Sequence, residues 1–289
     1  MDVEAPQRLA RALGESGGDG WLDRLPGIVE ETVSRQSLDV ERVVAPGGRS
    51  SLVLLVRLED GTPAALKLAP AAARPEAERT ALEHWDGRGA VRLLSSPGDA
   101  LVLERLHPEV SLRSLPESRA LLEAAGIVRR LWVEPPPGHG FETVAGRTAR
   151  QAEAMQGTAE PLVSSALAAR EELLAAPAEA LLLHGSFRQG KVLGADRVPW
   201  LAVGPEPVVG ERAYDLARLV RDRVEDLIAS PSGASATRRR VNRLADSLEL
   251  DPDRLRAWTL FRAVESATRG LRAGRVREAE VALEFASWL

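Results

Sequence analysis

His-Gly-Ser-Phe-Arg-Gln-Gly-Lys, from His184 to Lys191, forms a polar loop that is followed by the short apolar run Val192–Leu193. A second short apolar run, Trp200 to Val203, ends at Gly204 and a proline. The loop contains a histidine, a serine, an arginine and a lysine, and it contains no carboxylate. A site built on this loop therefore has no carboxylate of its own to use as a general base or as a metal ligand.

Length and composition indicate a folded protein that does not bind nucleic acid. The chain has 289 residues, of which 44% are hydrophobic, and this length suits two lobes or one large domain. The formal net charge of −4 argues against a protein that works by neutralising phosphates. The basic run Arg238-Arg239-Arg240 lies in a segment that also carries several acids, so we interpret it as a solvated helix face.

The sequence predicts a cytoplasmic protein. It contains no cysteine, which excludes disulfides and thiolate metal sites and fits a reducing compartment. The N-terminus lacks the basic start and apolar run of a signal peptide, and no apolar stretch reaches the roughly 18 residues of a membrane span. The four histidines lie far apart in sequence and form no pair with metal-ligand spacing.

The first part of the chain reads as a small sheet with helices packed on it. Residues 51–58 and 62–68 are strand-like and are joined by Glu59-Asp60-Gly61, a strong hairpin signal. Helical apolar spacing covers residues 21–35 and 75–85, and two further short strands are expected at 90–94 and 100–106.

From residue 111 onward the periodicity changes to that of helices. The apolar spacing predicts helices over residues 115–131, 143–155, 161–174, 214–227, 236–248, 253–271 and 275–288. The loop that ends at Lys191 and the two short apolar runs lie among these helices. The sequence therefore predicts a hairpin-rich first part and a helical second part.

Several short motifs, in this order, carry a family resemblance. They are Trp21-Leu22-Asp23-Arg24-Leu25-Pro26, Pro46-Gly47-Gly48, Ala65-Leu66-Lys67-Leu68, Trp85-Asp86-Gly87-Arg88-Gly89-Ala90-Val91, Leu103-Glu104-Arg105-Leu106, Leu131-Trp132, Pro205-Glu206-Pro207-Val208-Val209-Gly210 and Ala213-Tyr214-Asp215. Together with the polar loop, they give a chain that resembles the aminoglycoside phosphotransferases. The resemblance is to the branch of streptomycin and hydroxyurea phosphotransferases of actinobacteria, and it covers nearly the whole chain.

The resemblance implies the α+β fold of these proteins, which has two lobes and is like that of protein kinases. On this basis residues 1–106 are expected to form a small β-rich N-terminal lobe with a leading helix and one packed helix. Residues 107–289 are expected to form a larger helical C-terminal lobe that contains the polar loop.

In the first lobe, the resemblance implies a nucleotide site with ATP as the candidate cofactor. Lys67 matches the lysine that contacts the nucleotide phosphates, and Glu78 matches the carboxylate that orients this lysine. Gly47 and Gly48 match a turn where the backbone approaches the phosphates, because a side chain there would hold the nucleotide away. Glu104 lies in the linker whose backbone contacts adenine in the family.

In the second lobe, the positions that perform the chemistry in the family are changed. Ser186 replaces the aspartate base, and its hydroxyl cannot accept a proton as a carboxylate does. Lys191 and Gly204 stand at the two metal-ligand positions, where a cation and a missing side chain disfavour magnesium. Arg188 stands where the family usually has a second histidine. We therefore expect no metal site.

Two predicted contacts connect this loop with later parts of the chain. His184 and Asp215 match a pair that ties the loop to the following helix, with a catalytic role for His184 as the alternative. Glu206 replaces a basic residue of the family, and we expect it to form an ion pair with Lys191. The alternative is a metal-free anion pocket made by Lys67, Arg188 and Lys191.

The favoured function is that of a catalytically degenerate family member, a pseudokinase that binds a small-molecule ligand or a protein partner in actinobacterial secondary metabolism or antibiotic resistance. One alternative is weak ATP-dependent phosphorylation of an alcohol group on an aminoglycoside-like or other small metabolite. Another is a kinase fold reused for different biosynthetic chemistry at Ser186, Arg188, Lys191 and Glu206. The acids Asp222, Glu225, Asp226 and Glu265 of the helical part could meet a cationic ligand, and a solvated helix face explains them equally well.

Overall fold

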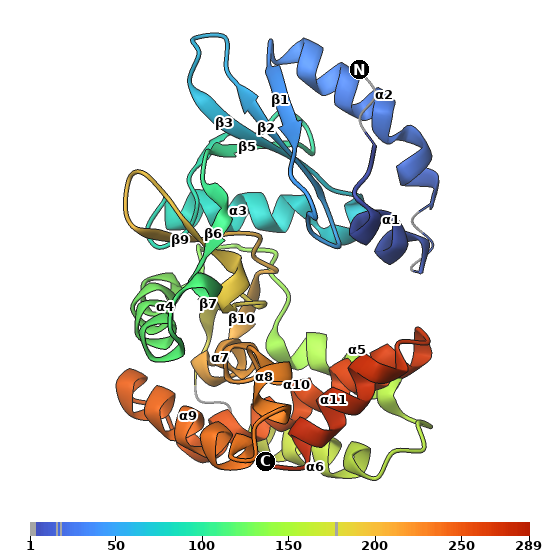
Figure 1. The fold of residues 1–289 in the computed structure, drawn as a ribbon, viewed down its shortest axis with the longest axis vertical. Coiled ribbons are helices and arrows are strands. Elements are labelled where there is room, and N and C mark those ends of the chain that lie inside the picture. The colour runs from blue at the N-terminus through green and yellow to red at the C-terminus, as the bar shows by residue number, and fades with distance from the viewer. Residues whose placement is uncertain (1–3, 16, 18, 177–178) are drawn as a thin grey trace. The chain divides into compact units, whose positions relative to one another are not determined.

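The computed structural model describes residues 4–15, 17, 19–176 and 179–289, and it divides into two compact units (Figure 1). The first unit extends to Ser111 and also includes Leu193–Val203. The second unit consists of Leu112–Val192 and Gly204–Leu289. The first is built on β-sheet and the second on helices, as predicted. The division of the chain into lobes at residue 106 stays a prediction.

The first unit contains a five-stranded antiparallel sheet in the order β1-β2-β3-β5-β4. Its strands are β1 (Asp39–Val43), β2 (Leu52–Arg57), β3 (Pro63–Leu68), β4 (Leu93–Ser95) and β5 (Leu101–Glu104). The predicted hairpin is confirmed, because β2 and β3 pair along their whole length from Arg57 opposite Pro63 to Leu52 opposite Leu68. Lys67 therefore lies on a central strand of the sheet.

Helices α1 (Gln7–Gly14) and α2 (Asp19–Arg35) share one apolar core with this sheet. Leu9 and Leu25 of the helices pack with Leu52, Leu54 and Leu66 of the strands, and each of these side chains is buried. A 3-10 turn (Ala71–Ala73) leads into α3 (Pro75–Trp85), which begins with proline in its first turn. Packing of two helices on one sheet excludes water from the strand that carries Lys67.

A second, smaller sheet belongs mainly to the first unit and has the order β6-β8-β9. Its strands are β6 (His107–Ser111), β8 (Val192–Gly194) and β9 (Trp200–Ala202). The two short apolar runs that follow the polar loop are therefore strands of this sheet. Arg197, between β8 and β9, donates hydrogen bonds to the carboxylate of Glu104 at 2.8 and 3.1 Å.

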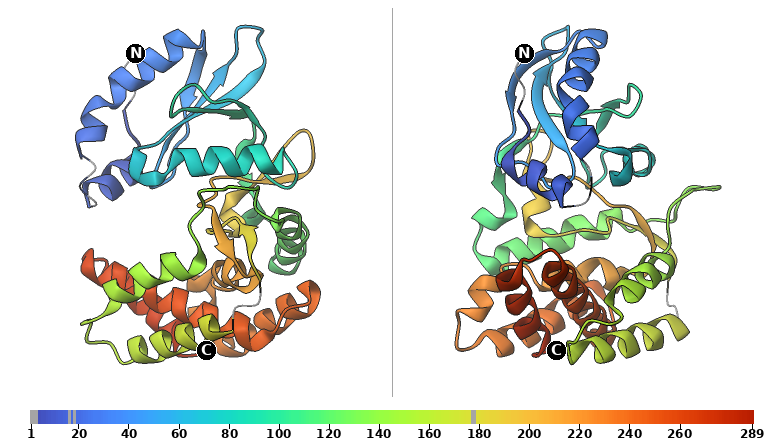
Figure 2. Two further views of the ribbon diagram at one scale, coloured as in Figure 1. Left: turned by 180° about the vertical axis from the view of Figure 1, so that it is seen from behind. Right: turned by 90° about the vertical axis from the view of Figure 1, so that its right-hand side faces the viewer.

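The second unit is assembled around α10, which packs against α5, α6, α7, α9 and α11. The views in Figure 2 show α10 and α11 side by side. The helices are α4 (Glu117–Leu131), α5 (Val144–Met155), α6 (Leu162–Ala175), α7 (Arg212–Val220), α8 (Val224–Ile228), α9 (Gly233–Leu248), α10 (Pro252–Arg272) and α11 (Val276–Ala286). Trp258 of α10 meets Tyr214 and Phe261 edge to face, at ring-centre distances of 5.2 and 6.0 Å.

Two features of the second unit differ from the expectation. The helix predicted over residues 214–227 is two helices, because Arg223 adopts a left-handed conformation between α7 and α8. Two short strands, β7 (Leu181–Leu183) and β10 (Val208–Gly210), pair with each other. β7 leads directly into the polar loop and β10 follows Glu206 and Pro207, so the pairing holds these two segments together. None of the helices in the described part of the chain is long and apolar enough to span a membrane.

Candidate functional site

The start of the polar loop is fixed by Asp215 on α7. Its carboxylate accepts hydrogen bonds from the backbone N–H groups of His184 at 3.0 Å and Gly185 at 2.8 Å, and from the indole N–H of Trp132 at 3.3 Å. Asp215 and His184 are both fully buried. Burial raises the pKa of Asp215, and the charge of Arg262 and these N–H donors oppose the rise. The predicted link between His184 and Asp215 is confirmed, and it runs through the backbone.

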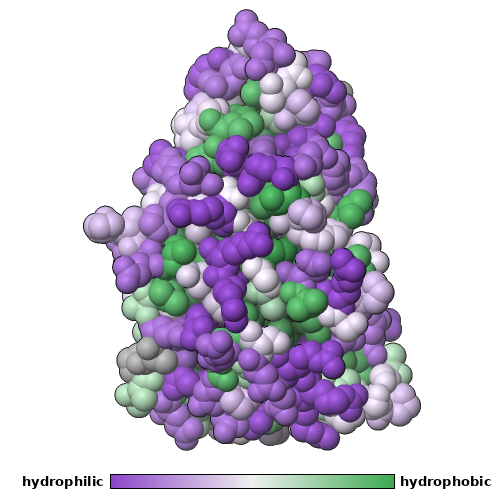
Figure 3. All heavy atoms as spheres, turned by 90° about the vertical axis from the view of Figure 1, so that its left-hand side faces the viewer, coloured by the Kyte–Doolittle hydropathy of each residue, from purple (hydrophilic) through white to green (hydrophobic). Residues whose placement is uncertain are grey.

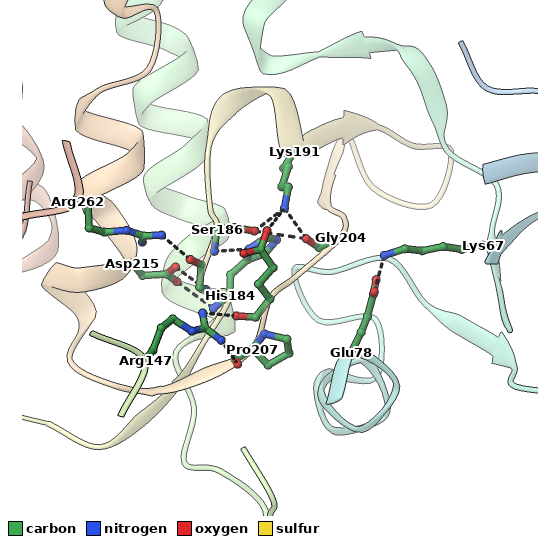
Figure 4. A network of polar contacts seen from close by, with 12 residues as sticks. Lys67, Glu78, Arg147, His184, Ser186, Lys191, Gly204, Pro207, Asp215 and Arg262 are labelled. Carbon is green, nitrogen blue, oxygen red and sulfur yellow. Dashed lines mark hydrogen bonds and ion pairs between the residues drawn. The ribbon is translucent and has the colours of Figure 1, made fainter. Parts of the chain in front are cut away.

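The loop turns at Gly185, which lies against the segment that carries Glu206. Gly185 has φ of +75°, and its neighbour across the turn is the backbone carbonyl of Glu206. Arg147 of α5 donates to the carbonyls of Glu206 and Pro207, at 3.0 Å each, and holds this second segment in place (Figure 4). The two segments are thus locked together within the second unit.

Replacing Gly185 with alanine is expected to destabilise the protein by at least about 2 kcal/mol. A Cβ atom at this position would lie 1.9 Å from the carbonyl oxygen of Glu206, and the positive φ is strained for any other residue. Urea unfolding monitored by tryptophan fluorescence measures the change. Gly140→Ala is the control, since its added Cβ meets nothing within 4 Å. Equal unfolding midpoints for the two variants would contradict the packing described here.

The far end of the loop is fixed by Asp222, which follows α7. Its carboxylate accepts from the backbone N–H of Gln189 at 2.5 Å, and Arg223 donates to the side-chain oxygen of Gln189 at 2.9 Å. Arg240 of α9 in turn donates to the backbone carbonyl of Asp222 at 2.6 Å. Asp222 is buried and engaged, so its predicted contact with a cationic ligand is replaced by a structural role. A loop fixed at both ends presents its side chains in one arrangement.

The ammonium group of Lys191 lies at the centre of the loop's polar contacts (Figure 4). It donates to the hydroxyl of Ser186, to the backbone carbonyl of Gly204 at 2.7 Å and to the carboxylate of Glu206 at 3.3 Å. The predicted ion pair between Lys191 and Glu206 is confirmed. Four of the five positions at which the chain departs from the family pattern, residues 186, 191, 204 and 206, are therefore joined through one cation.

Glu206 has a carboxylate in positive surroundings. Desolvation favours its neutral form, but the charges of Lys191, Arg218, Arg147 and Arg262 outweigh this and hold the pKa of Glu206 far below its usual range. Its side chain is 54% exposed, whereas that of Lys191 is 19% exposed. Glu206 is therefore an anion at neutral pH, and its charge attracts the ammonium of Lys191.

Ser186 is poorly placed to act as a nucleophile. The residue is fully buried, and its hydroxyl lies 3.5 Å from the carbonyl of Gly204 while it accepts a hydrogen bond from Lys191. A nucleophilic serine needs a neighbouring base, and an ammonium that is donating a hydrogen bond is not one. The geometry favours a structural role in which Ser186 helps to bind the ammonium of Lys191.

Magnesium does not fit this arrangement. Hard divalent cations need several oxygen ligands that carry negative charge, and here the available oxygens already surround an ammonium. In the part of the chain that the structure describes, no three histidine, cysteine, aspartate or glutamate side chains come together as a metal site would require. Asp196 and Glu211, the other acids near in sequence, pair instead with His107 and Arg254. The oxygens of Ser186, Gly204 and Glu206 bind the ammonium of Lys191 where a magnesium ion would otherwise lie.

In the first unit, Lys67 and Glu78 form the predicted pair. The ammonium of Lys67 donates to the carboxylate of Glu78 on α3, and both residues are buried, with exposed fractions of 8% and 3%. The second carboxylate oxygen of Glu78 is buried without a hydrogen-bond partner. Such a pair fixes a cation beside the sheet, and it fits the contact that a nucleotide phosphate would need. Its role in binding a nucleotide stays a prediction.

The remaining residues predicted for the nucleotide lie in the same unit. Gly47 has φ of +68°, and a Cβ there would lie 3.0 Å from the carbonyl of Val44, so the turn requires glycine. Gly48 is exposed beside it. The carboxylate of Glu104 accepts from the backbone N–H of Arg92 at 2.7 Å as well as from Arg197. Their contacts with a nucleotide stay predictions.

Two observations about the basic residues were missed in the sequence-based interpretation. Lys67 and Lys191 are the only lysines in the sequence, and every other basic side chain apart from histidine is arginine. Arg188, Arg218, Arg221, Arg262 and Arg269 gather on the loop and on α7 and α10 of the second unit. The spacing of these arginines, three apart on one helix and seven on the other, was the available signal.

The comparisons with known proteins agree with this geometry. The family model described as aminoglycoside/hydroxyurea antibiotic resistance kinase matches residues 36–274. The chain is 35% identical to streptomycin 6-kinase of Streptomyces glaucescens, over 92% of this chain and 90% of the relative. It is 36% identical to hydroxyurea phosphotransferase of Kitasatospora aureofaciens, over 97% of this chain and 85% of the relative.

Solved structures agree on the fold. The crystal structure of the aminoglycoside phosphotransferase APH(4)-Ia superposes with a TM-score of 0.64 at 17% identity, covering 91% of this chain and 97% of that one. A thermostable mutant of the same protein, in a ternary complex with AMP-PNP and hygromycin B, gives a TM-score of 0.62 at 19% identity and covers 89% and 96%. The kinase-like fold with a β-rich N-lobe and a helical C-lobe is confirmed. The chain belongs to the aminoglycoside/hydroxyurea antibiotic resistance kinase family.

Proposed function

We propose that this chain is a catalytically degenerate member of its phosphotransferase family, a pseudokinase that binds a small-molecule ligand without transferring phosphate. The observation that carries the proposal is the position of the Lys191 ammonium, bound by Ser186, Gly204 and Glu206. This ammonium takes the place of the metal, and Ser186 stands at the position of the base, so both groups that phosphoryl transfer in this fold requires are lacking.

The expected losses in catalytic rate support a protein with almost no phosphoryl transfer. Removing one preorganised electrostatic group costs roughly 10²- to 10³-fold in rate, and removing the metal site as well costs more, although such losses are not additive. The alternative, a weak phosphotransferase acting on an alcohol group, is favoured only by family membership. It would need a metal site elsewhere, and no group of three histidine, cysteine, aspartate or glutamate side chains among the described residues provides one.

A small molecule is favoured over a protein partner. The large hydrophobic side chains that are exposed, Leu94, Val110, Leu122 and Val276, belong to four different elements. Figure 3 shows one face of the molecule on which hydrophilic side chains predominate and hydrophobic ones form small separate groups. Isolated exposed apolar residues are normal and do not mark an interface.

The relatives suggest the biological setting and the nucleotide. Streptomycin and hydroxyurea kinases from Streptomyces and Kitasatospora support a role in antibiotic resistance or secondary metabolism, and a cytoplasmic location is part of the proposal. ATP is the candidate cofactor, because the buried pair of Lys67 and Glu78 provides a fixed cation and because a structural neighbour was solved with AMP-PNP. Such binding would not depend on magnesium.

Calorimetric titration with ATP, with and without magnesium, tests the proposal. We expect binding that magnesium does not strengthen, no ADP formation, and a loss of roughly tenfold in affinity when Lys67 is removed. The variant Lys67→Met/Glu78→Gln removes both charges, so that no buried carboxylate is left unpaired. Lys191→Met is the matched control, because that lysine belongs to the other half of the family site.

The scarcity of lysine gives a second readout. NMR of protein labelled at lysine should give side-chain signals from Lys67 and Lys191 alone, so each half of the family site reports separately. ATP should shift the signal of Lys67 and leave that of Lys191 in place. Sustained ADP formation that requires magnesium would disprove the pseudokinase proposal and establish the weak phosphotransferase in its place.

A further inference from the structure

An arginine cluster in the second unit has no counterpart in the proposed function described so far. It consists of Arg188 of the polar loop, Arg218 and Arg221 at the end of α7, and Arg262 and Arg269 on α10. Helices α7 and α10 pack against each other, and the charges of these arginines act on one another. Arg269 is exposed and the other four are partly buried, so the cluster reaches solvent.

Two of the five arginines have structural partners. Arg262 donates to the carbonyls of Gly185 at 2.9 Å and Tyr214 at 3.1 Å, and its guanidinium lies 4.3 Å from the centre of the Tyr214 ring. Arg269 forms an ion pair with Glu265. Glu265 is thereby engaged, so it is not available to a cationic ligand as the sequence suggested. These contacts fix the side of the cluster that belongs to α10.

The other three arginines have donors that are not used. Nε of Arg188 and Nη1 of Arg221 are buried without a hydrogen-bond partner. Arg218 makes no hydrogen bond or ion pair with any residue in the described part of the chain. Buried donors without an acceptor are rare in folded proteins, because each one costs free energy. Their presence on Arg188 and Arg221, beside the unpaired Arg218, indicates that the acceptor comes from another molecule.

Charge supports the same conclusion. The carboxylates that face the cluster are Glu206, Asp215, Glu265 and, at the rim beside Arg269, Glu278. Glu206 is shared with Lys191 and Arg147, and Asp215 is occupied by backbone donors. Burial, followed by the charges of the neighbouring arginines, lowers the pKa of Arg218 to about 10 and that of Arg221 to about 9. Both remain cations at neutral pH and repel each other.

We propose that the arginine cluster is a binding site for a small multivalent oxyanion, a molecule that bears phosphate or several carboxylates. The guanidinium group offers planar, paired N–H donors that match both kinds of oxyanion. A multivalent anion would accept from the unused donors and offset the repulsion between Arg218 and Arg221. This inference rests on the proposed function. It names the chemical class of the small molecule that the protein binds without transferring phosphate to it.

Thermal unfolding and calorimetry with pyrophosphate and with citrate, each compared with sodium chloride at matched ionic strength, test the inference. We expect at least one of the two anions to raise the melting temperature by about 4 °C at roughly one hundred times its dissociation constant. The two arms identify whether phosphate or carboxylate is the better ligand. Arg218→Gln/Arg221→Gln should weaken binding at least tenfold, and it should melt no lower than the native protein when no anion is present.

A control variant distinguishes anion binding by the arginine cluster from nonspecific attraction to other positively charged side chains. Arg243→Gln removes one exposed arginine of α9 and should leave anion binding unchanged. If the double arginine variant does not fold, Arg188→Gln serves in its place, because its buried Nε has no partner to lose.

The outcomes for this inference and for the proposed function are distinct. The anion site would be overturned if the arginine variants bound each anion as tightly as the native protein does. It would also be overturned if neither anion raised the melting temperature more than sodium chloride at the same ionic strength. Neither result would restore phosphoryl transfer. Magnesium-dependent turnover of ATP would overturn the proposed function and would leave the measured affinity of the arginine cluster for anions as it stands.

Discussion

The variant Ser186→Asp/Lys191→Asn/Gly204→Asp is expected to form ADP from ATP in the presence of magnesium, at a rate at least about a hundredfold above that of the native protein. The three changes supply the base and the two metal ligands that the family pattern has at these positions. They also remove the ammonium that now occupies the same place, where it is bound by the oxygens of Ser186, Gly204 and Glu206.

The structure indicates why the three changes are needed together. An aspartate at residue 186 alone would pair with the ammonium of Lys191, as the hydroxyl does now. Gly204 has φ of +59°, which aspartate and asparagine tolerate better than most residues. A Cβ at residue 204 would first meet the end of the Lys191 side chain at 3.9 Å, and a shorter asparagine at residue 191 leaves more room.

A coupled assay of ADP release, in magnesium and in EDTA, measures the gain. Adding Lys67→Met/Glu78→Gln to the triple variant should abolish the activity, because the pair in the first unit is predicted to hold the phosphates. A triple variant that melts near the native temperature and stays inactive would show that the loss of catalysis extends beyond these three positions. Equal magnesium-dependent activity in the native protein would refute the premise.

Local signals in the sequence predicted much of the fold. The Asp-Gly turn and the alternation on either side of it were sufficient for the β2–β3 hairpin, because both act over a few residues. The strands β7 and β10 were missed, since each has three residues and exists through pairing with the other. The break between α7 and α8 was also missed. It depends on Arg223, which donates to the carbonyls of Leu112, Arg113 and Leu115 far away in the sequence.

The two lysine pairs of the site could be predicted because opposite charges stood at positions of a known pattern. The burial of arginines could not be predicted in the same way. Arg240 belongs to a run that we interpreted as a solvated helix face, yet its side chain is 1% exposed and is paired with Glu117. The long apolar stem of an arginine can be buried while its guanidinium pairs with a carboxylate from a distant part of the sequence. Whether a given arginine is buried therefore depends on tertiary packing, which the local sequence does not specify.

The positions of the two lysines indicate the site, although the combined number of lysines and arginines does not show it. A chain that uses arginine at every other strongly basic position keeps lysine at residues 67 and 191. At residue 191 the compact ammonium donates to the hydroxyl of Ser186, the carbonyl of Gly204 and the carboxylate of Glu206. A bulkier guanidinium at this position would have to displace these oxygens to be bound by the same three groups.

Asp215→Ala is expected to destabilise the protein by about 3–5 kcal/mol, a large part of the 5–15 kcal/mol that stabilises a typical domain. The carboxylate is the acceptor for the buried backbone N–H groups of His184 and Gly185 and for the indole of Trp132. Without it, these donors are left unsatisfied in the buried interior, and Arg262 loses the attraction of one opposite charge.

Asp215→Asn is the more informative change, because it keeps the shape and alters only the donors and acceptors. One oxygen becomes an NH₂ group that must face a backbone N–H, since both carboxylate oxygens accept from the loop. Urea unfolding should place Asp215→Asn between the native protein and Asp215→Ala. Asp226→Asn, at an exposed position of α8, makes the same chemical change and should unfold with the native protein. If Asp215→Asn is as stable as Asp226→Asn, the loop is held by other contacts, and the rigid presentation of Lys191 loses its explanation.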